Sequence, residues 1–147
     1  MVEVAAAVIV KNGRVLIAQR REDDKLPLKW EFPGGKVEAG ETPEECLVRE
    51  MREEFSIDIS VGDCICASEF EYEHISVRLT GYFAEWLGGS LRPAEHRQIR
   101  WVLPSELDGI DFAPADVPIA EEVKRRLLQK KLVCGSGGSR MEGGRQK

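Results

Sequence analysis

The stretch that most constrains this chain is residues 34–57, GGKVEAGETPEECLVREMREEFSI. Its glycine pair leads into strong helix-start signals, because Thr42 can cap a helix, Pro43 suits the first helical position and Glu45 completes a capping box. Apolar residues then recur at helical spacing. The pattern predicts a helix over residues 43–55 with one buried face.

The same helix carries three carboxylates at spacings that place them close together. Glu50, Glu53 and Glu54 stand at i, i+3 and i+4, with Arg49 beside them. Like charges at this spacing destabilise a helix by a few tenths of a kcal/mol per pair. A hard cation would convert that repulsion into ligation, and oxygen ligands suit Mg²⁺ or Mn²⁺. Taken alone, such a glutamate-rich face is more typical of solvated surface.

The complete string resembles the signature of the Nudix hydrolases, G-x5-E-x7-R-E-apolar-x-E-E-x-G-apolar. The matching positions are Gly35, Glu41, Arg49, Glu50, Met51, Glu53, Glu54 and Ile57. One position departs, since Ser56 stands where the signature has its last glycine. A left-handed conformation is usual directly after a helix, and serine tolerates it less well than glycine. We therefore expect a strained or differently wound helix exit.

Four stretches are similar to the MutT-type subgroup, the 8-oxo-dGTP diphosphatases and CTP pyrophosphohydrolases. They are LIAQR (16–20), WEFPGGKVEAGETPEE (30–45), AEHRQIRW (94–101) and FAPADVPI (112–119). The resemblance implies an α/β fold, the Nudix α/β/α sandwich with a central mixed β-sheet. We expect one Nudix domain at residues 1–133. Residues 134–147 lack an apolar stripe and are expected to be a flexible C-terminal tail.

The remaining elements follow from local patterns. Asn12-Gly13 predicts a hairpin turn between two strands. Expected strands are residues 3–10, 14–20, 30–33, 58–73, 75–87 and 98–103, with a short turn or helix at 104–108 and a second amphipathic helix at 118–132.

The resemblance also implies the metal site and the catalytic residues. The implied ligands are the Gly34 carbonyl and the carboxylates of Glu50, Glu53, Glu54 and Glu95. Glu50 is either a ligand or the general base, and Glu95 is a ligand, a base or ordinary surface charge. Arg49 is expected to orient a glutamate by a bidentate pair. The implied catalytic set is Arg49, Glu50, Glu53 and Glu95, with Mg²⁺ as cofactor and Mn²⁺ able to substitute.

Four residues are expected to bind substrate. Arg20 and Lys36 would contact phosphate, unless they are ordinary surface charges. Phe32 would line the nucleoside pocket, although core packing is the commoner fate of an aromatic residue. Asp116 would either read the base or cap the helix that follows it. An ionised Asp116 could accept two donors from a guanine-type edge, whereas a bidentate match to cytosine needs a protonated Asp116. His74 and His96 lack metal-ligand spacing and are expected to be structural or exposed.

Composition narrows the functional class. The net charge of -5 disfavours a nucleic-acid polymer as partner. No apolar run reaches the roughly 18 residues of a membrane span. The four cysteines are expected to be reduced thiols of a cytoplasmic protein. The monomeric and homodimeric states both stay open.

The predicted function is a Mg²⁺-dependent nucleoside triphosphate pyrophosphohydrolase that releases a nucleoside monophosphate and pyrophosphate. The first expectation is an 8-oxo-dGTP diphosphatase in nucleotide-pool sanitation. The alternative is a (d)CTP or modified-dCTP pyrophosphohydrolase. Other Nudix substrates, such as ADP-ribose, a dinucleoside polyphosphate or an RNA cap, are a further enzymatic alternative. From a different class, the chain would be a catalytically silent Nudix-fold nucleotide sensor.

Overall fold

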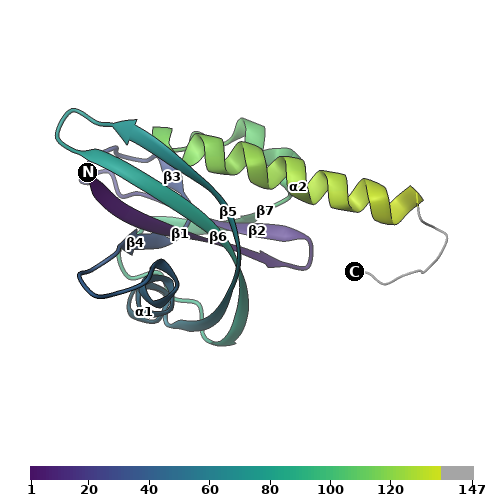
Figure 1. The fold of residues 1–147 in the computed structure, drawn as a ribbon, viewed down its shortest axis with the longest axis horizontal. Helices are drawn as coiled ribbons and strands as arrows, with labels where there is room; N and C mark the ends of the chain where they lie inside the picture. Colours follow the sequence, from purple (N-terminus) through teal and green to yellow (C-terminus); the bar gives the residue numbers. More distant parts are fainter. Residues whose placement is uncertain (137–147) are drawn as a thin grey trace.

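Strand β1 (Val2–Lys11) lies at the centre of a mixed seven-stranded sheet (Figure 1). In this computed structural model, which describes residues 1–136 and the side chains of residues 1–129, β1 pairs in parallel with β6 (Ser76–Gly89). It pairs antiparallel with β2 (Arg14–Gln19) and β4 (Gly34–Lys36). The remaining strands are β3 (Trp30–Glu31), β5 (Ile57–Glu71) and β7 (Gln98–Val102).

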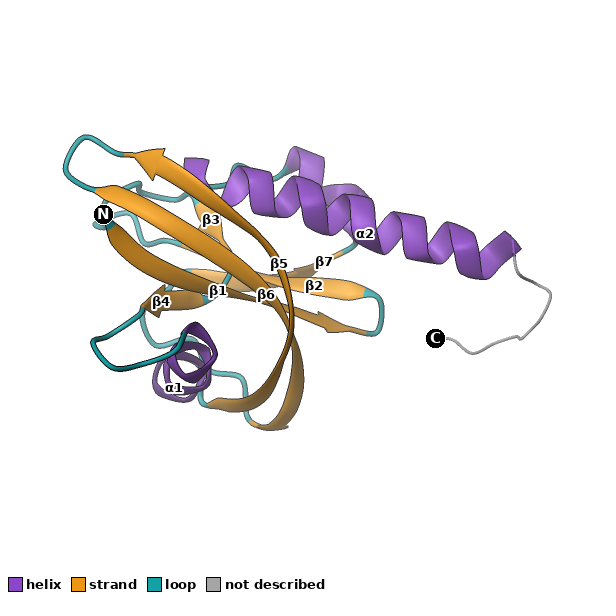
Figure 2. Ribbon diagram, viewed as in Figure 1, coloured by secondary structure: helices purple, strands orange, loops and turns teal. Residues whose placement is uncertain are grey.

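Two helices cover opposite faces of this sheet, α1 (Pro43–Phe55) and α2 (Val117–Ser136) (Figure 2). Successive side chains of a strand point to opposite faces. Ala5, Ala7 and Ile9 therefore pack in the core under α1, whereas Ala6 and Val8 pack in the core under α2. Two short 3-10 helices, η1 (Pro104–Gly109) and η2 (Pro114–Asp116), precede α2. The expected α/β/α sandwich around a mixed sheet is confirmed.

Local chemistry explains the ends of these elements. Asn12 and Gly13 have positive φ values of 53° and 75°, as the predicted turn requires. The capping box of α1 is formed, because Glu45 N donates to Thr42 Oγ1 at 3.1 Å and Thr42 N donates to Glu45 Oε1 at 2.9 Å. Ser56 adopts the left-handed conformation, at φ 61° and ψ 33°. The helix exit thus keeps the geometry of the missing glycine.

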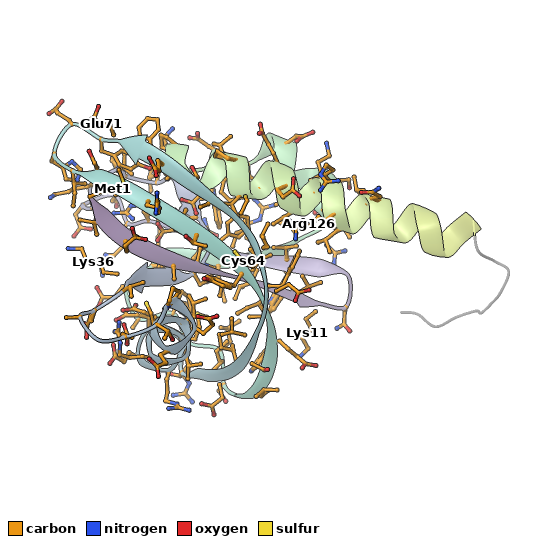
Figure 3. The ribbon with its side chains drawn as sticks, in the orientation of Figure 1. Met1, Lys11, Lys36, Cys64, Glu71 and Arg126 are labelled. Carbon is orange, nitrogen blue, oxygen red and sulfur yellow. The ribbon has the colours of Figure 1, made fainter. Side chains whose placement is uncertain are left out.

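The strand predicted at residues 30–33 is too long, because β3 ends at Glu31 and a separate strand that was not predicted, β4, begins at Gly34. β3 pairs with β2, whereas β4 pairs with β1, and the chain changes partner at Phe32 and Pro33. Lys36, at the end of β4, and Lys11, at the end of β1, lie at opposite ends of the sheet (Figure 3). The change of partner places Gly34 opposite Ala6, near the middle of β1.

The second helix is longer than predicted. It runs from Val117 to Ser136 and so continues past the expected domain end at residue 133. The rest of the predicted tail, residues 137–147, lies outside the described residues. Within residues 1–136, no helix combines the length and the apolar character that a membrane crossing requires.

Candidate active site

An acidic cavity of about 630 Å³ opens beside the C-terminal half of α1. Glu50 and Glu54 stand one helical turn apart on α1 and therefore share a face. The cavity contains four of the five predicted metal ligands, together with Glu31 and His96. Its lining residues are Arg21, Asp23, Asp24, Glu31, Gly34, Glu50, Glu54, Glu95 and His96.

This donor set fits a divalent cation. Glu54 Oε1 is buried and accepts no hydrogen bond from the described residues. Burial raises the pKa of Glu50 even though Arg49 donates a hydrogen bond to it. No three acidic, histidine or cysteine side chains in the described part of the chain form a ready-made metal cage. Mg²⁺ commonly needs only one or two carboxylates, since it keeps waters and also binds substrate phosphates.

Arg49 organises the carboxylates of α1. Its Nε and Nη2 donate to the two oxygens of Glu41 at 2.7 and 3.0 Å, which makes Glu41 the bidentate partner. Its Nη1 donates to Glu50 Oε2 at 2.9 Å and to Glu53 Oε1 at 3.2 Å. The bonds from Arg49 lower the pKa of Glu41 to about 2. Glu53 is exposed and does not line the acidic cavity, so the structure does not bring it together with the other predicted ligands.

The glycine pair of β4 allows α1 to approach the sheet. A Cβ on Gly35 would lie 2.3 Å from Glu50 Cδ, and a Cβ on Gly34 would lie 1.9 Å from the Ala5 carbonyl oxygen. Both distances are far below van der Waals contact. The glycines therefore leave the space in which the Glu50 carboxylate and strand β1 lie.

The loop of residues 90–97 brings Glu95 to the acidic cavity. Ala94 N donates to Glu54 O and Arg92 N donates to Phe55 O, both at 2.9 Å. These bonds satisfy carbonyls at the C-terminal end of α1 that have no partner within the helix. A loop docked on the end of α1 thereby supplies a carboxylate that is distant in sequence.

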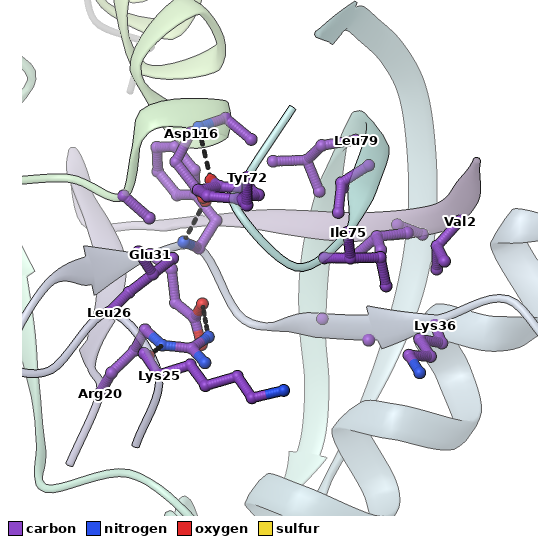
Figure 4. A pocket seen from close by; sticks show the side chains of 18 of the residues that line it. Val2, Arg20, Lys25, Leu26, Glu31, Lys36, Tyr72, Ile75, Leu79 and Asp116 are labelled. Atoms are coloured by element: carbon purple, nitrogen blue, oxygen red, sulfur yellow. Dashed lines mark hydrogen bonds and ion pairs between the residues drawn. The ribbon is translucent and has the colours of Figure 1, made fainter. Parts of the chain in front are cut away.

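A second cavity, of about 360 Å³, adjoins the first and shares Glu31 and Gly34 with it. It contains all four predicted substrate residues, Arg20, Phe32, Lys36 and Asp116 (Figure 4). Lys25, Tyr72 and His74 also line it, along with apolar side chains from β1 and β6. The combination of cations, aromatic rings and one buried acid suits a nucleoside with phosphates.

Asp116 faces this second cavity and is buried. Its Oδ2 accepts a hydrogen bond from Phe32 N at 3.0 Å. Among the described residues, no amide of α2 donates to its carboxylate, so the geometry does not support a helix cap. Burial, followed by the negative charge of Glu31, raises the pKa of Asp116 well above its ordinary value.

Phe32 and Arg20 both already have partners within the protein, which limits their availability to bind substrate. Phe32 is only 3% exposed and stacks on Phe112 with ring centroids 5.1 Å apart, so it packs in the core as well as lining the cavity. Arg20 donates to Glu31 Oε1 at 2.9 Å, to Asp24 Oδ1 at 3.0 Å and to the Lys25 carbonyl at 2.7 Å. A phosphate would therefore have to compete with these partners for Arg20.

Lys25, Glu31 and His96 are residues of the site that were not identified from the sequence as functional. Glu31 lies between the cavities, bonded to Arg20 through one oxygen and to His96 Nε2 through the other, at 2.6 Å. His96, expected to be structural or exposed, lines the acidic cavity and has an 11% exposed side chain. Glu31 and His96 stand 65 residues apart in the chain, so no local pattern indicated their contact.

Known proteins are similar to this chain over most of its length. The NUDIX domain model matches residues 1–127. The CTP pyrophosphohydrolase of Escherichia coli strain K12 is 37% identical over 121 residues, covering 82% of this chain and 90% of its own length. The 8-oxo-dGTP diphosphatase of the same strain is 33% identical over 115 residues, covering 78% of this chain and 89% of its own length.

Solved structures show the same fold. The solution structure of the E. coli ORF135 protein superposes with a TM-score of 0.75 at 36% identity, covering 84% of this chain and 88% of that one. MutT from methicillin-resistant Staphylococcus aureus 252 superposes with a TM-score of 0.70 at 42% identity, covering 85% of this chain and 96% of that one. With the domain match spanning most of the sequence, the chain belongs to the Nudix family.

Proposed function

We propose that this Nudix hydrolase cleaves nucleoside triphosphates into a nucleoside monophosphate and pyrophosphate. One observation supports this above all: an acidic cavity suited to metal-bound phosphates adjoins a cavity suited to a nucleoside, and the two share Glu31 and Gly34. A single nucleotide could occupy both. Phosphoryl transfer depends mainly on positioning and charge neutralisation, and this arrangement can supply both.

Glu50, Glu54, Glu95 and the Gly34 carbonyl would hold Mg²⁺, for which Mn²⁺ would substitute. When bound, such an ion neutralises phosphate charge and lowers the pKa of water. Glu53 is exposed outside the acidic cavity and would have to turn toward it to join these ligands. Alternatively, Glu50 would leave the ligand set and accept a proton from the attacking water, because the hydrogen bond from Arg49 holds its carboxylate at the cavity. Arg49 holds the Glu50 carboxylate in place for that role.

The phosphates would also meet cationic side chains. Arg20, Lys25 and Lys36 line the nucleoside cavity. Arg20 already binds Glu31 and Asp24, so a phosphate that displaces these carboxylates gains a rigid, fork-shaped donor. These residues would orient the triphosphate between the two cavities.

Base selection would rest on Asp116. A neutral carboxyl presents a donor beside an acceptor. The N7–H and O6 of 8-oxoguanine present the complementary pair, whereas unoxidised guanine presents two acceptors at that edge. Cytosine also presents a donor beside an acceptor. A neutral Asp116 would therefore accept 8-oxo-dGTP and dCTP, in contrast to the ionised Asp116 expected for 8-oxo-dGTP from the sequence.

The leading candidate stays 8-oxo-dGTP, as expected from the sequence, with (d)CTP or modified dCTP as the alternative that the same carboxyl supports. Of the two E. coli relatives, one is named for CTP and the other for 8-oxo-dGTP, so both candidate substrates are represented among similar proteins. We place the activity in the cytoplasm, in nucleotide-pool sanitation. The described cysteines Cys46, Cys64 and Cys66 are free thiols, which suits a reducing compartment. For the oligomeric state, the prediction stays a monomer or a homodimer.

A nucleotide panel tests the proposal. 8-oxo-dGTP, dGTP, dCTP, CTP and ADP-ribose would be incubated with the protein and Mg²⁺, with and without inorganic pyrophosphatase. Phosphate should appear only when pyrophosphatase is present, and chromatography should show the monophosphate. Phosphate release without pyrophosphatase would contradict the proposed cleavage. Nucleotide binding without any turnover would favour the sensor alternative.

A further inference from the structure

We infer that His96 is a positioning residue that holds the 90–97 loop so that Glu95 reaches the acidic cavity. The inference deepens the proposed function and rests on it, because it concerns how the chain presents a metal ligand. It assigns a role to a histidine that carries no recognisable ligand spacing in the sequence.

His96 is held from two sides. Its Nε2 lies 2.6 Å from Glu31 Oε2, and its ring stacks on Phe55 with centroids 5.3 Å apart and planes at 27°. Glu31 is the last residue of strand β3, and Phe55 is the last residue of helix α1. His96 therefore ties the loop both to the sheet and to the helix that carries Glu50 and Glu54.

The direction of the hydrogen bond follows from its partners. An ionised carboxylate only accepts, so Nε2 carries the proton and donates to Glu31. The other ring nitrogen, Nδ1, is buried and has no partner among the described residues. Glu31 is consequently the one polar group in the described structure that fixes the orientation of this ring. Arg20 holds the opposite oxygen of Glu31 and keeps that carboxylate in place.

Glu95 depends on its neighbours for its position. No described side chain or amide bonds to its carboxylate, and the residue is exposed on the rim of the cavity. On one side, Ala94 N is bonded to Glu54 O at 2.9 Å. On the other side, the His96 side chain is bonded to Glu31. Loss of the His96–Glu31 hydrogen bond would remove the side-chain contact that holds the loop directly after Glu95. The main-chain bond from Arg97 N to Gln19 O, at 2.9 Å, would remain.

The expected size of the effect follows from other metal sites. Groups that orient metal ligands without touching the metal typically change metal affinity by about 10–100-fold when they are removed. Because the main-chain anchors of the loop remain, we expect the lower end of this range. The change should appear in metal binding itself and not only in turnover.

Two substitutions separate the hydrogen bond from the packing. His96→Phe keeps a ring on Phe55 but loses the donor, whereas His96→Gln keeps a donor near the position of Nε2. Binding of Mn²⁺ to the nucleotide-free protein would be measured by electron paramagnetic resonance. We expect an affinity about tenfold weaker in His96→Phe and close to wild type in His96→Gln. Added Mn²⁺ should restore kcat in His96→Phe, with KM for the nucleotide little changed.

Two further variants test whether the change in Mn²⁺ affinity acts through Glu95 and not through a general loss of stability. Thr42→Ala removes the cap at the far end of α1, so it should lower Tm while leaving Mn²⁺ affinity unchanged. It thereby controls for lost stability. The double variant of His96→Phe with Glu95→Gln should bind Mn²⁺ no more weakly than Glu95→Gln alone, because both changes act through one carboxylate.

Several outcomes would overturn the inference. Wild-type Mn²⁺ affinity in His96→Phe, the same loss in His96→Gln as in His96→Phe, or an additive loss in the double variant would each do so. These results leave the proposed function standing if the wild-type protein hydrolyses nucleotides. Absence of hydrolysis by the wild type would overturn the proposed function instead, while the Mn²⁺ affinities would still decide the role of His96.

Discussion

Replacing Gly35 with alanine should impair catalysis far more than folding. The new Cβ would lie 2.3 Å from Glu50 Cδ and within 2.7 Å of both carboxylate oxygens, against 3.4 Å for ordinary contact. The carboxylate must therefore move by about 1.1 Å or more. Gly35 does not have a positive φ, so its backbone accepts alanine without strain. A misplacement of about 1 Å in a catalytic group can cost about 10²-fold in rate.

The assay would compare kcat at saturating Mg²⁺ and nucleotide with the Tm of the same preparation. We expect kcat to fall about 10²-fold, while Tm changes little, because the clash involves the end of a flexible side chain. Gly34→Ala provides the contrast. Its Cβ would lie 1.9 Å from the Ala5 carbonyl oxygen, which is backbone in the central strand and cannot turn aside. That variant should lose stability first.

Wild-type kcat in a folded Gly35→Ala protein would refute the reasoning. It would mean that the Glu50 carboxylate can leave its position between Gly35 and Arg49 without consequence. Glu50 would then be neither the proton acceptor nor a ligand whose placement matters. Equal loss of stability in the two glycine variants would refute the claim that only Gly34 faces immovable backbone.

Three further perturbations test other parts of the site. Glu54→Gln should lower kcat by at least about 10²-fold with an unchanged circular dichroism spectrum, and wild-type turnover would remove Glu54 from the mechanism. Because the raised pKa of Asp116 keeps its carboxyl neutral below that pKa, kcat/KM for 8-oxo-dGTP and dCTP should fall as pH rises through it, and Asp116→Asn should abolish the fall. The same linkage predicts that wild-type protein loses stability relative to Asp116→Asn as pH rises above the pKa of an unfolded aspartate, measured by Tm across a pH series. Arg49→Lys loses the two-pronged bond to Glu41, so half-maximal activation should need about tenfold more Mg²⁺.

Features fixed by neighbouring residues were predictable from the sequence. The capping box placed the start of α1 at Pro43. The Asn-Gly turn and the two long strands of the β5–β6 hairpin were also visible as local patterns. Leu26 and Leu28 show where this fails, since both adopt positive φ in a loop without the glycine or asparagine that usually marks such a turn.

Features that depend on distant contacts were not predictable. Helical spacing grouped Glu50, Glu53 and Glu54, but it could not tell which arc of α1 faces the cavity. Packing on β4 turns Glu50 inward and leaves Glu53 exposed beside Arg49. The contact of His96 with Glu31 likewise depends on the docking of the 90–97 loop against α1. A single sequence carries no local signal for such a contact.

The parallel pairing of β1 with β6 has a consequence for how the protein reaches its fold. Residues 2–9 must wait for residues 77–84 before this part of the sheet can close. Closing so long a loop costs entropy before any contact offsets it, and distant pairings of this kind slow folding. During synthesis the apolar first strand would leave the ribosome well before its partner exists. Gly34 and Gly35 rest on that strand, so hydrolytic activity should return late in refolding, after the parallel pair has formed.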